Sequence, residues 1–160
     1  MLIRAATDQD AKDLAQIHVQ SWAETYPGLL PAEEIAAYPY DLRLAQWQGV
    51  LARGGTRVVL IDGTGFAQIG PQREARFKPD YPEELYALYL LGTAQGRGLG
   101  RALLRAALGP APRPFTAVVL ASNARALGFY TRIGGQQIAR TRGEDGLEDL
   151  VLGWPDPGMI

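Results

Sequence analysis

A glycine-rich stretch near the middle of the chain has the residue types of an anion-binding turn. Directly after Gln95, glycine occupies every second position, at Gly96, Gly98 and Gly100. Glycine lets the backbone approach a ligand without a Cβ atom in the way. If a helix starts here, its first amides have no partner within the helix, and the helix dipole adds partial positive charge. We therefore expect a pyrophosphate group at this turn.

The stretch does not match two common nucleotide motifs. It lacks the lysine and the Ser/Thr of a P-loop, so hydrolysis of ATP or GTP is not expected. The third glycine of the dinucleotide-binding fingerprint would fall where Arg101 stands. Taken by itself, the stretch could also be an ordinary strand–helix connection that needs small residues.

The flanking segments predict the elements that would position this turn. Residues 84–91 are apolar and aromatic, which predicts a buried strand. Residues 101–108 carry Leu104 and Leu108 one turn apart, which predicts a helix. Further along, residues 114–121 predict a second buried strand, and Ser122 or Asn123 can cap a helix over residues 124–132.

Three motifs resemble the GNAT N-acetyltransferase superfamily. The pattern Gln-x-x-Gly-x-Gly resembles the loop that binds the pyrophosphate of acetyl-coenzyme A (acetyl-CoA). Residues 123–134 are similar to a second signature, in which an asparagine precedes small residues, Phe-Tyr and glycine. Residues 17–31 are similar to a stretch found in many bacterial members. The motifs stand in the family's order and spacing, and each alone has a structural alternative, such as a helix cap or core aromatic residues.

The resemblance implies a set of residues for acetyl-CoA and a general acid. Asn123 would hold the pantetheine arm, and Tyr130 would protonate the departing thiolate. Backbone groups of Leu90 and Leu91 would face the pantetheine and the thioester, although many members have a proline where this chain has Gly92. The pyrophosphate would be bound by consecutive residues of the turn: Gln95, Gly96, Arg97, Gly98, Leu99, Gly100 and Arg101.

Glu84 is the candidate general base, because it aligns with the glutamate that often heads this strand in the family. An amine at neutral pH is mostly an ammonium and must lose a proton before it can attack a thioester. Glu84 could take that proton directly or through water. Alternatively, the pair Glu83-Glu84 could be the solvated edge of a loop, since residues 70–83 hold three prolines and several charges.

The N-terminal half is expected to supply the acceptor side. The resemblance suggests that Trp22 and Tyr26 border the substrate pocket, and the alternative is that both aromatic residues fill the core. The only histidine, His18, lies on a partly apolar helix face and is expected to pack or hydrogen-bond. A helix over residues 40–53 and a hairpin turning at Asp62-Gly63 should follow.

Composition restricts the remaining classes of function. The chain has 160 residues, a net charge of −1 and no cysteine, so a disulfide or an acyl-cysteine intermediate is excluded. Scattered charges disfavour a nucleic-acid surface. The N-terminus has no signal-peptide pattern and no apolar run could span a bilayer, so a cytoplasmic location is expected.

These observations predict a single α/β domain over residues 1–154, with an irregular tail over residues 155–160. On the resemblance, its mixed, twisted sheet is flanked by helices, and two central strands splay apart to form an acyl-CoA cleft. The expected function is direct transfer of an acetyl group from acetyl-CoA to a primary amine of a small molecule, without a metal. A non-catalytic acyl-CoA sensor, a protein amine as acceptor, a longer acyl group and a homodimer remain open.

Overall fold

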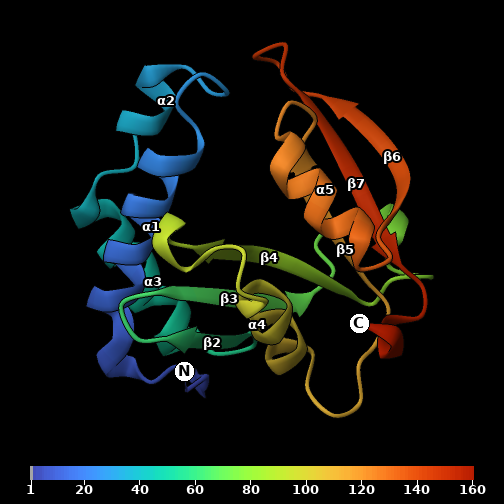
Figure 1. Cartoon of the computed structure of the whole chain (residues 1–160), viewed down its shortest axis with the longest axis horizontal. Coiled ribbons are helices and arrows are strands. Elements are labelled where there is room, and N and C mark those ends of the chain that lie inside the picture. The colour runs from blue at the N-terminus through green and yellow to red at the C-terminus, as the bar shows by residue number, and fades with distance from the viewer. Residues whose placement is uncertain (1) are drawn as a thin grey trace. The chain divides into compact units, whose positions relative to one another are not determined.

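The computed structural model describes residues 2–160 as a mixed α/β fold with an open sheet flanked by helices (Figure 1). Within these residues, seven strands form one sheet in the order β1-β2-β3-β4-β5-β7-β6. The strands are β1 (Arg4–Ala5), β2 (Arg57–Ile61), β3 (Gly65–Pro71), β4 (Glu83–Leu90), β5 (Phe115–Leu120), β6 (Gln136–Arg142) and β7 (Glu148–Trp154). The helices are α1 (Ala11–Thr25), α2 (Ala32–Ala36), α3 (Tyr40–Arg53), α4 (Leu99–Leu108) and α5 (Ala124–Arg132). The expected fold class is confirmed.

The chain divides into two compact units. The first holds the residues up to Gln68 together with Ala87–Ala107, and the second holds Ile69–Tyr86 and Leu108–Ile160. Strands β3 and β4 contribute residues to both units. Each unit is described by itself below, and the single domain stays a prediction.

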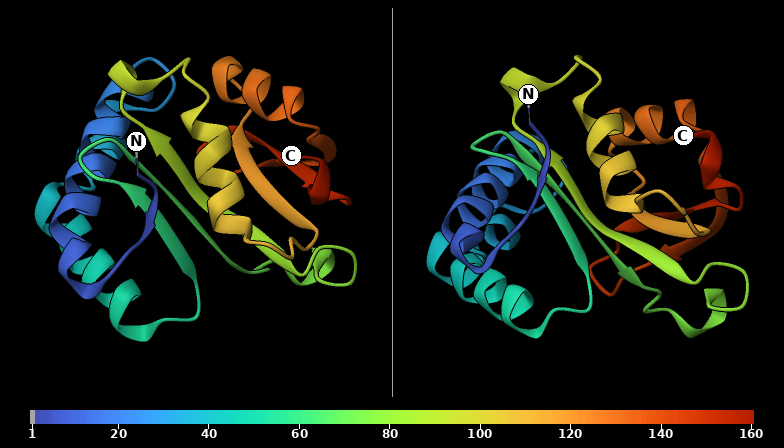
Figure 2. Two further views of the ribbon diagram at one scale, coloured as in Figure 1. Left: turned by 60° about the horizontal axis from the view of Figure 1, so that its bottom comes forward. Right: turned by 90° about the horizontal axis from the view of Figure 1, so that it is seen from below.

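The first unit has its core between two N-terminal helices and the start of the sheet. Leu14 and Ile17 lie three positions apart on α1, so they share a face, and both are fully buried. They pack with Trp47 of α3 and with Leu60 and Phe66 of the strands. Figure 2 shows α1 and α3 along one face of the strands of this unit, with α4 on the other face. Burial of both sheet faces explains why residues 57–61 and 65–69 are so apolar.

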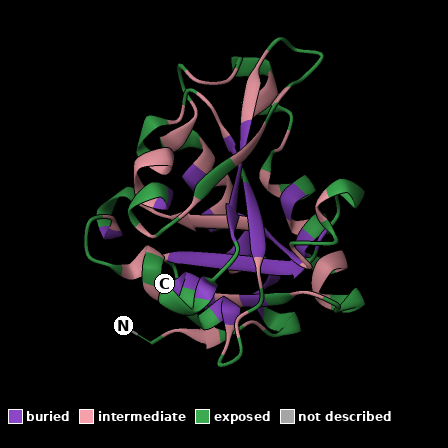
Figure 3. Cartoon of the chain, turned by 90° about the vertical axis from the view of Figure 1, so that its right-hand side faces the viewer, coloured by how far each residue is buried: buried purple, intermediate pink, exposed green. Residues whose placement is uncertain are grey.

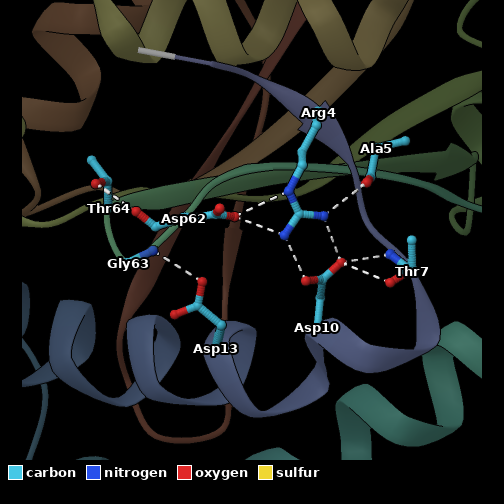
Figure 4. A network of polar contacts seen from close by, with 8 residues as sticks. All are labelled: Arg4, Ala5, Thr7, Asp10, Asp13, Asp62, Gly63 and Thr64. Carbon is cyan, nitrogen blue, oxygen red and sulfur yellow. Dashed lines mark hydrogen bonds and ion pairs between the residues drawn. The ribbon is translucent and has the colours of Figure 1, made fainter.

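A charged network fixes the N-terminal strand to the predicted hairpin (Figure 4). Gly63 has φ of +60°, which suits the turn between β2 and β3, and this hairpin is confirmed. Asp62, in the same turn, accepts a hydrogen bond from Arg4 at 2.7 Å, and Arg4 also pairs with Asp10 at 2.7 Å. The Arg4 guanidinium holds the pKa of Asp10 at about 2, well below its usual value. Residues from β1, the start of α1 and the hairpin are thereby joined.

The second unit is built on β5, which pairs with β4 on one edge and β7 on the other. The parallel pairs with β4 run from Glu83–Phe115 to Leu85–Ala117, and β4 continues to Leu90 beyond them. The antiparallel pairs with β7 run along the whole of β5, from Phe115 opposite Trp154 to Leu120 opposite Asp149. The two predicted strands therefore lie side by side, whereas their splaying stays a prediction.

Trp154 organises the core of this second unit. Its ring stacks on Phe115 with centroids 4.5 Å apart, and its Nε1 donates a hydrogen bond to the carbonyl of Ile133 at 3.2 Å. A Cβ atom at Gly135 would lie 2.7 Å from the Trp154 ring, so only glycine fits there. Figure 3 shows buried residues concentrated on strands and exposed residues on loops and outer helix faces.

Two local predictions are wrong in part. The segment 70–83 was expected as a loop, but β3 continues to Pro71 and the short 3-10 turn η2 (Ala75–Phe77) follows. The tail was expected to be irregular, but it contains the 3-10 turn η4 (Pro157–Met159), and Ile160 is buried. Burial of the terminal isoleucine stabilises an ordered tail that a local pattern of prolines does not indicate.

Candidate active site

The glycine turn has the backbone conformation of an anion-binding turn. Gly96 and Gly98 both have φ of +76°, a region that side chains with a Cβ atom rarely adopt. A Cβ atom at either position would have nothing within 4 Å, so the backbone there is uncovered within the chain. The amide of Ala102 donates to the carbonyl of Gly98 at 3.1 Å, which starts the hydrogen bonding of α4. The amides that precede it in the first turn suit a negatively charged ligand.

Gln95 connects this turn to the end of β4. Its Nε2 donates to the carbonyl of Leu90 at 2.9 Å, within the first unit. Its Oε1 atom is buried and has no hydrogen-bond partner among the described residues. Gln95 therefore positions the turn, in addition to any contact that its orphaned oxygen makes with a ligand.

The backbone groups of Leu91 are occupied, whereas the amide of Leu90 faces the other way. The Leu91 amide donates to the carbonyl of Thr64, and its carbonyl accepts from Ala94, both at 2.9 Å. Successive amides point to opposite edges of a strand, so the amide of Leu90 points away from Thr64. That geometry leaves the Leu90 amide as the better candidate to contact a thioester carbonyl.

Gly92, which stands where many family members have a proline, forms a hydrogen bond through its backbone amide. The Gly92 amide donates to Oε2 of Glu24 at 2.8 Å, and η3 (Gly92–Ala94) follows directly. Proline has no N–H group and could not make this bond. The glycine therefore ties the end of β4 to α1.

Glu84 is buried at the start of β4, in an ion pair with an exposed arginine that the sequence did not reveal. Arg73 donates from Nε to Oε1 at 3.2 Å and from Nη2 to Oε2 at 2.8 Å, and its backbone amide also donates to Oε1 at 3.2 Å. Arg73 also lies over the ring of Tyr86 at 3.8 Å. The hydrogen bonds to Glu84 raise the pKa of Arg73. Both carboxylate oxygens of Glu84 are thus engaged by one side chain.

The solvated loop edge that was the alternative for these glutamates is not observed. Glu83 and Glu84 are each only 5% exposed. Arg73 was missed because it lies in a charged, proline-rich segment without periodicity, where nothing local singles out one arginine.

Asn123 and Tyr130 belong to α5 in the second unit. Asn123 caps this helix, and its Oδ1 accepts from the amide of Ala126 at 3.2 Å. Tyr130 is buried, and its ring packs edge-on against Trp154 with centroids 5.6 Å apart. Asn123 therefore acts as a helix cap and Tyr130 as a core aromatic residue, which are the structural alternatives to their roles in the family. Their assignment to acetyl-CoA stays a prediction.

Trp22 and Tyr26 come together with Tyr89 in the first unit. The Tyr89 hydroxyl accepts from Nε1 of Trp22 at 3.1 Å and lies 3.3 Å from the Tyr26 hydroxyl. Trp22 also contacts Tyr38 with ring centroids 5.5 Å apart. All four of these aromatic side chains are partly buried, so they are neither sealed in the core nor free in solvent. The sequence pattern missed Tyr38 and Tyr89 because they are brought in from other elements.

His18 has the packing role expected for it. Its Nδ1 accepts a hydrogen bond from Nε1 of Trp47 at 3.2 Å, and its ring contacts Phe66 with centroids 5.5 Å apart. Burial, and then the positive charge of Arg43, lowers the pKa of His18 to about 3. A neutral imidazole with an engaged Nδ1 is a structural acceptor.

The comparisons with known proteins agree with this geometry. The model of the Acetyltransferase (GNAT) family matches residues 12–135, which is more than half of the chain. The chain belongs to the GNAT acetyltransferase family. It is also 32% identical over 163 residues to the uncharacterized N-acetyltransferase YuaI of Bacillus subtilis, covering 96% of this chain and 92% of that protein.

Solved structures show the same fold at lower identity. The PaiA N-acetyltransferase of Thermoplasma acidophilum, in complex with coenzyme A, has a TM-score of 0.70 at 18% identity, covering 95% of this chain and 96% of that one. YncA of Salmonella typhimurium, solved with its cofactor acetyl-CoA, has a TM-score of 0.68 at 21% identity, covering 96% of this chain and 92% of that one.

Family membership confirms the expected enzyme class. This GNAT chain is an acyl-CoA-dependent acetyltransferase with acetyl-CoA as donor. The glycine turn fits that donor, because its uncovered backbone follows the end of β4 and opens a helix. Among residues 2–160, no cluster of three or more His, Cys, Asp or Glu side chains could hold a metal ion. The helices of that same range include none with the length and apolar character to cross a bilayer.

Proposed function

We propose that this GNAT enzyme transfers the acetyl group directly to a primary amine of a small molecule. The observation that carries the proposal is the group of partly buried aromatic side chains in the first unit, Trp22, Tyr26, Tyr38 and Tyr89. Aromatic faces with polar tips bind small organic ligands well, because one end is apolar and the other can hydrogen-bond. Trp22 and Tyr26 are the substrate-binding residues in this proposal.

The donor would be held by backbone groups and three side chains. The amides of the glycine turn bind the pyrophosphate, and the positive charges of Arg97 and Arg101 favour it. The Asn123 amide group holds the pantetheine arm, since its Oδ1 is already used by the helix cap. The positive φ angles of Gly96 and Gly98 support this role of the turn.

Three groups of the chain would act on the reacting atoms. Acetyl-CoA supplies an activated thioester when bound. Glu84 accepts the amine proton, through water if Arg73 remains paired to its carboxylate. The Leu90 amide donates to the thioester carbonyl, and Tyr130 donates its phenolic proton to the departing thiolate. Holding two substrates together supplies on the order of 7–11 kcal/mol in well-oriented cases.

The test is a screen for release of free coenzyme A thiol from acetyl-CoA. Acceptors are small primary amines, peptides with free N-termini or lysines, and a blank without acceptor. We expect at least one small amine to accelerate thiol release about tenfold or more over the blank, with no peptide doing so. Preference for a peptide would identify a protein acetyltransferase. Calorimetric binding of acetyl-CoA without acceleration by any amine would identify a non-catalytic sensor.

A further inference from the structure

Arg43 of α3 is a buried cation that has no acidic partner within residues 2–160. Arg43 is only 7% exposed. Its guanidinium forms no ion pair with a carboxylate of the described residues. Nη1 donates to Oε1 of Gln46 at 3.1 Å. Nε and Nη2 are buried and have no hydrogen-bond partner among the described residues. Burial of a charge with unmatched donors is unfavourable, so this arrangement calls for an explanation.

Two aromatic rings lie against this guanidinium. Its central carbon lies 4.6 Å from the ring centroid of Trp22 and 4.3 Å from that of Tyr38. The π faces of the two rings stabilise the cation. The neighbouring imidazole of His18 cannot neutralise it either, since His18 is neutral and its Nδ1 is already bonded to Trp47.

The two unmatched nitrogens of Arg43 are the pair that binds a carboxylate side-on. The same chain shows this use in Arg73, where Nε and Nη2 hold the two oxygens of Glu84 at 3.2 and 2.8 Å. A planar carboxylate matches such a fork with two parallel hydrogen bonds. Because Nη1 is bonded to Gln46 while Nε and Nη2 are unmatched among the described residues, Arg43 offers that edge for an external oxyanion.

We propose that Arg43 binds a carboxylate of the acetyl acceptor, so that the acceptor belongs to the amino-acid class rather than to simple amines or polyamines. This inference rests on the proposed function, since it assigns the acceptor of the same site. Trp22 and Tyr38, whose rings lie against the guanidinium, belong to the aromatic group that supports a small-molecule acceptor. A purely cationic polyamine would place an ammonium beside a buried guanidinium without compensation.

Access to the fork requires movement of the atoms that cover it. Nε and Nη2 are covered by neighbouring atoms, whereas Tyr38 is partly exposed. Tyr38 lies between α2 and α3, outside both helices, so its ring can turn without breaking helix hydrogen bonds. A bound carboxylate would change the environment of the Trp22 indole, which provides a spectroscopic signal.

The experiment measures binding and transfer with matched ligands. For each amino acid of a panel, the free acid is compared with its carboxamide and with the corresponding amine that lacks the carboxyl carbon. N-acetylated amino acids and their carboxamides serve as non-reacting probes, titrated by tryptophan fluorescence and NMR. The variants are Arg43→Met, which keeps the apolar stem, and Arg43→Lys, which keeps the charge. Arg53→Gln, an exposed arginine at the end of the same helix, is the control.

We expect the N-acetyl amino acid to bind the wild type and the Arg53→Gln variant alike. Arg43→Met should weaken that binding about tenfold or more, because two charge-assisted hydrogen bonds are lost, with Arg43→Lys in between. The carboxamide should bind weakly and equally to all variants. If Arg43→Met does not fold by circular dichroism, Arg43→Lys is compared alone.

Equal binding of acid and carboxamide, or unchanged binding to a folded Arg43 variant, would overturn the proposal. The experiment distinguishes failure of the Arg43 assignment from failure of the proposed function. Transfer to amines without preference for a carboxylate would leave the function and remove the Arg43 assignment. Binding of the N-acetyl amino acid through Arg43 without transfer to any amine would keep the Arg43 assignment and remove the proposed function.

Discussion

At the scale of single residues, the candidate catalytic groups are also structural groups. Tyr130 packs against Trp154, and Glu84 is held by Arg73. A substitution that lowers activity can therefore act through the fold. The informative variants are those for which the catalytic and structural roles predict opposite results.

The Tyr130→Phe variant separates the catalytic role from the structural role of the proposed general acid. The change keeps the ring and its contact with Trp154 and removes only the hydroxyl. A phenol is protonated at neutral pH and can donate to a leaving thiolate. We expect kcat to fall by around 10²-fold, with little change in acetyl-CoA affinity. A lower melting temperature with an unchanged kcat would assign the hydroxyl to the fold instead.

A test of Glu84 needs a second variant at its partner Arg73, so that loss of the ion pair can be separated from loss of the general base. If Glu84 accepts the amine proton, Glu84→Gln should lower turnover at neutral pH, while Arg73→Gln should leave turnover largely intact. Glu83→Gln is the matched control, since Glu83 is buried to the same extent. Steady-state kinetics and melting temperature are measured for all three. Equal loss of stability with wild-type kcat in Glu84→Gln and Arg73→Gln would reduce the ion pair to a structural role.

At the scale of elements, the end of β4 and the start of α4 act together. Gln95 and Glu24 hold the intervening segment through the carbonyl of Leu90 and the amide of Gly92. These bonds leave the glycine backbone of the turn uncovered. The turn is thereby positioned before any ligand arrives, which lowers the entropic cost of binding.

Gly98→Glu tests this turn as a pyrophosphate site. Space around the position lets the side chain fit, so circular dichroism should stay native-like, apart from a backbone strain of about 1–2 kcal/mol at its positive φ. Gly98→Ala carries the same strain without the charge and is the control. By calorimetry, we expect Gly98→Glu to lose acetyl-CoA binding and Gly98→Ala to retain most of it. Unchanged affinity in a folded Gly98→Glu variant would place the pyrophosphate elsewhere.

At the scale of the whole molecule, a partly buried, neutral histidine makes stability depend on pH. The pKa of His18 falls from 6.5 to about 3 on folding, mainly because of burial. Below pH 6.5 the unfolded chain binds a proton that the folded chain does not, so stability is complete above that pH and is lost as the pH falls. The loss approaches about 1.4 kcal/mol per pH unit well below pH 6.5.

His18→Gln keeps an acceptor for Trp47 without the titration. Urea unfolding between pH 7.5 and 4.5 should show the free energy of unfolding falling more steeply for the wild type than for His18→Gln. Asp10 does not confuse this window, because its pKa falls from 3.8 to about 2 and its contribution is lost only at lower pH. Parallel curves for the two proteins would show that His18 does not control acid stability.

Local patterns in the sequence determined the elements and the family. The periodicity of residues 40–53, the cap at Asn123 and the turn at Asp62-Gly63 each depend on residues close along the chain, and α3, α5 and the β2–β3 hairpin appear where they indicate. The glycine turn was identifiable for the same reason. Helix, strand and turn preferences are set over a few residues, so a single sequence carries them.

Only the tertiary structure decided which side chains became partners. Trp22 is hydrogen-bonded to Tyr89, which lies 67 positions away in the sequence, and Glu24 is hydrogen-bonded to Gly92, which lies 68 positions away. Arg43 lies against aromatic residues of α1 and of the segment before α3, and Arg73 pairs with Glu84. No local preference distinguishes these arginines from the exposed ones, because burial and hydrogen bonding arise only when distant elements pack. The acceptor-side residues, and with them the proposed carboxylate site, are therefore a property of the packed chain.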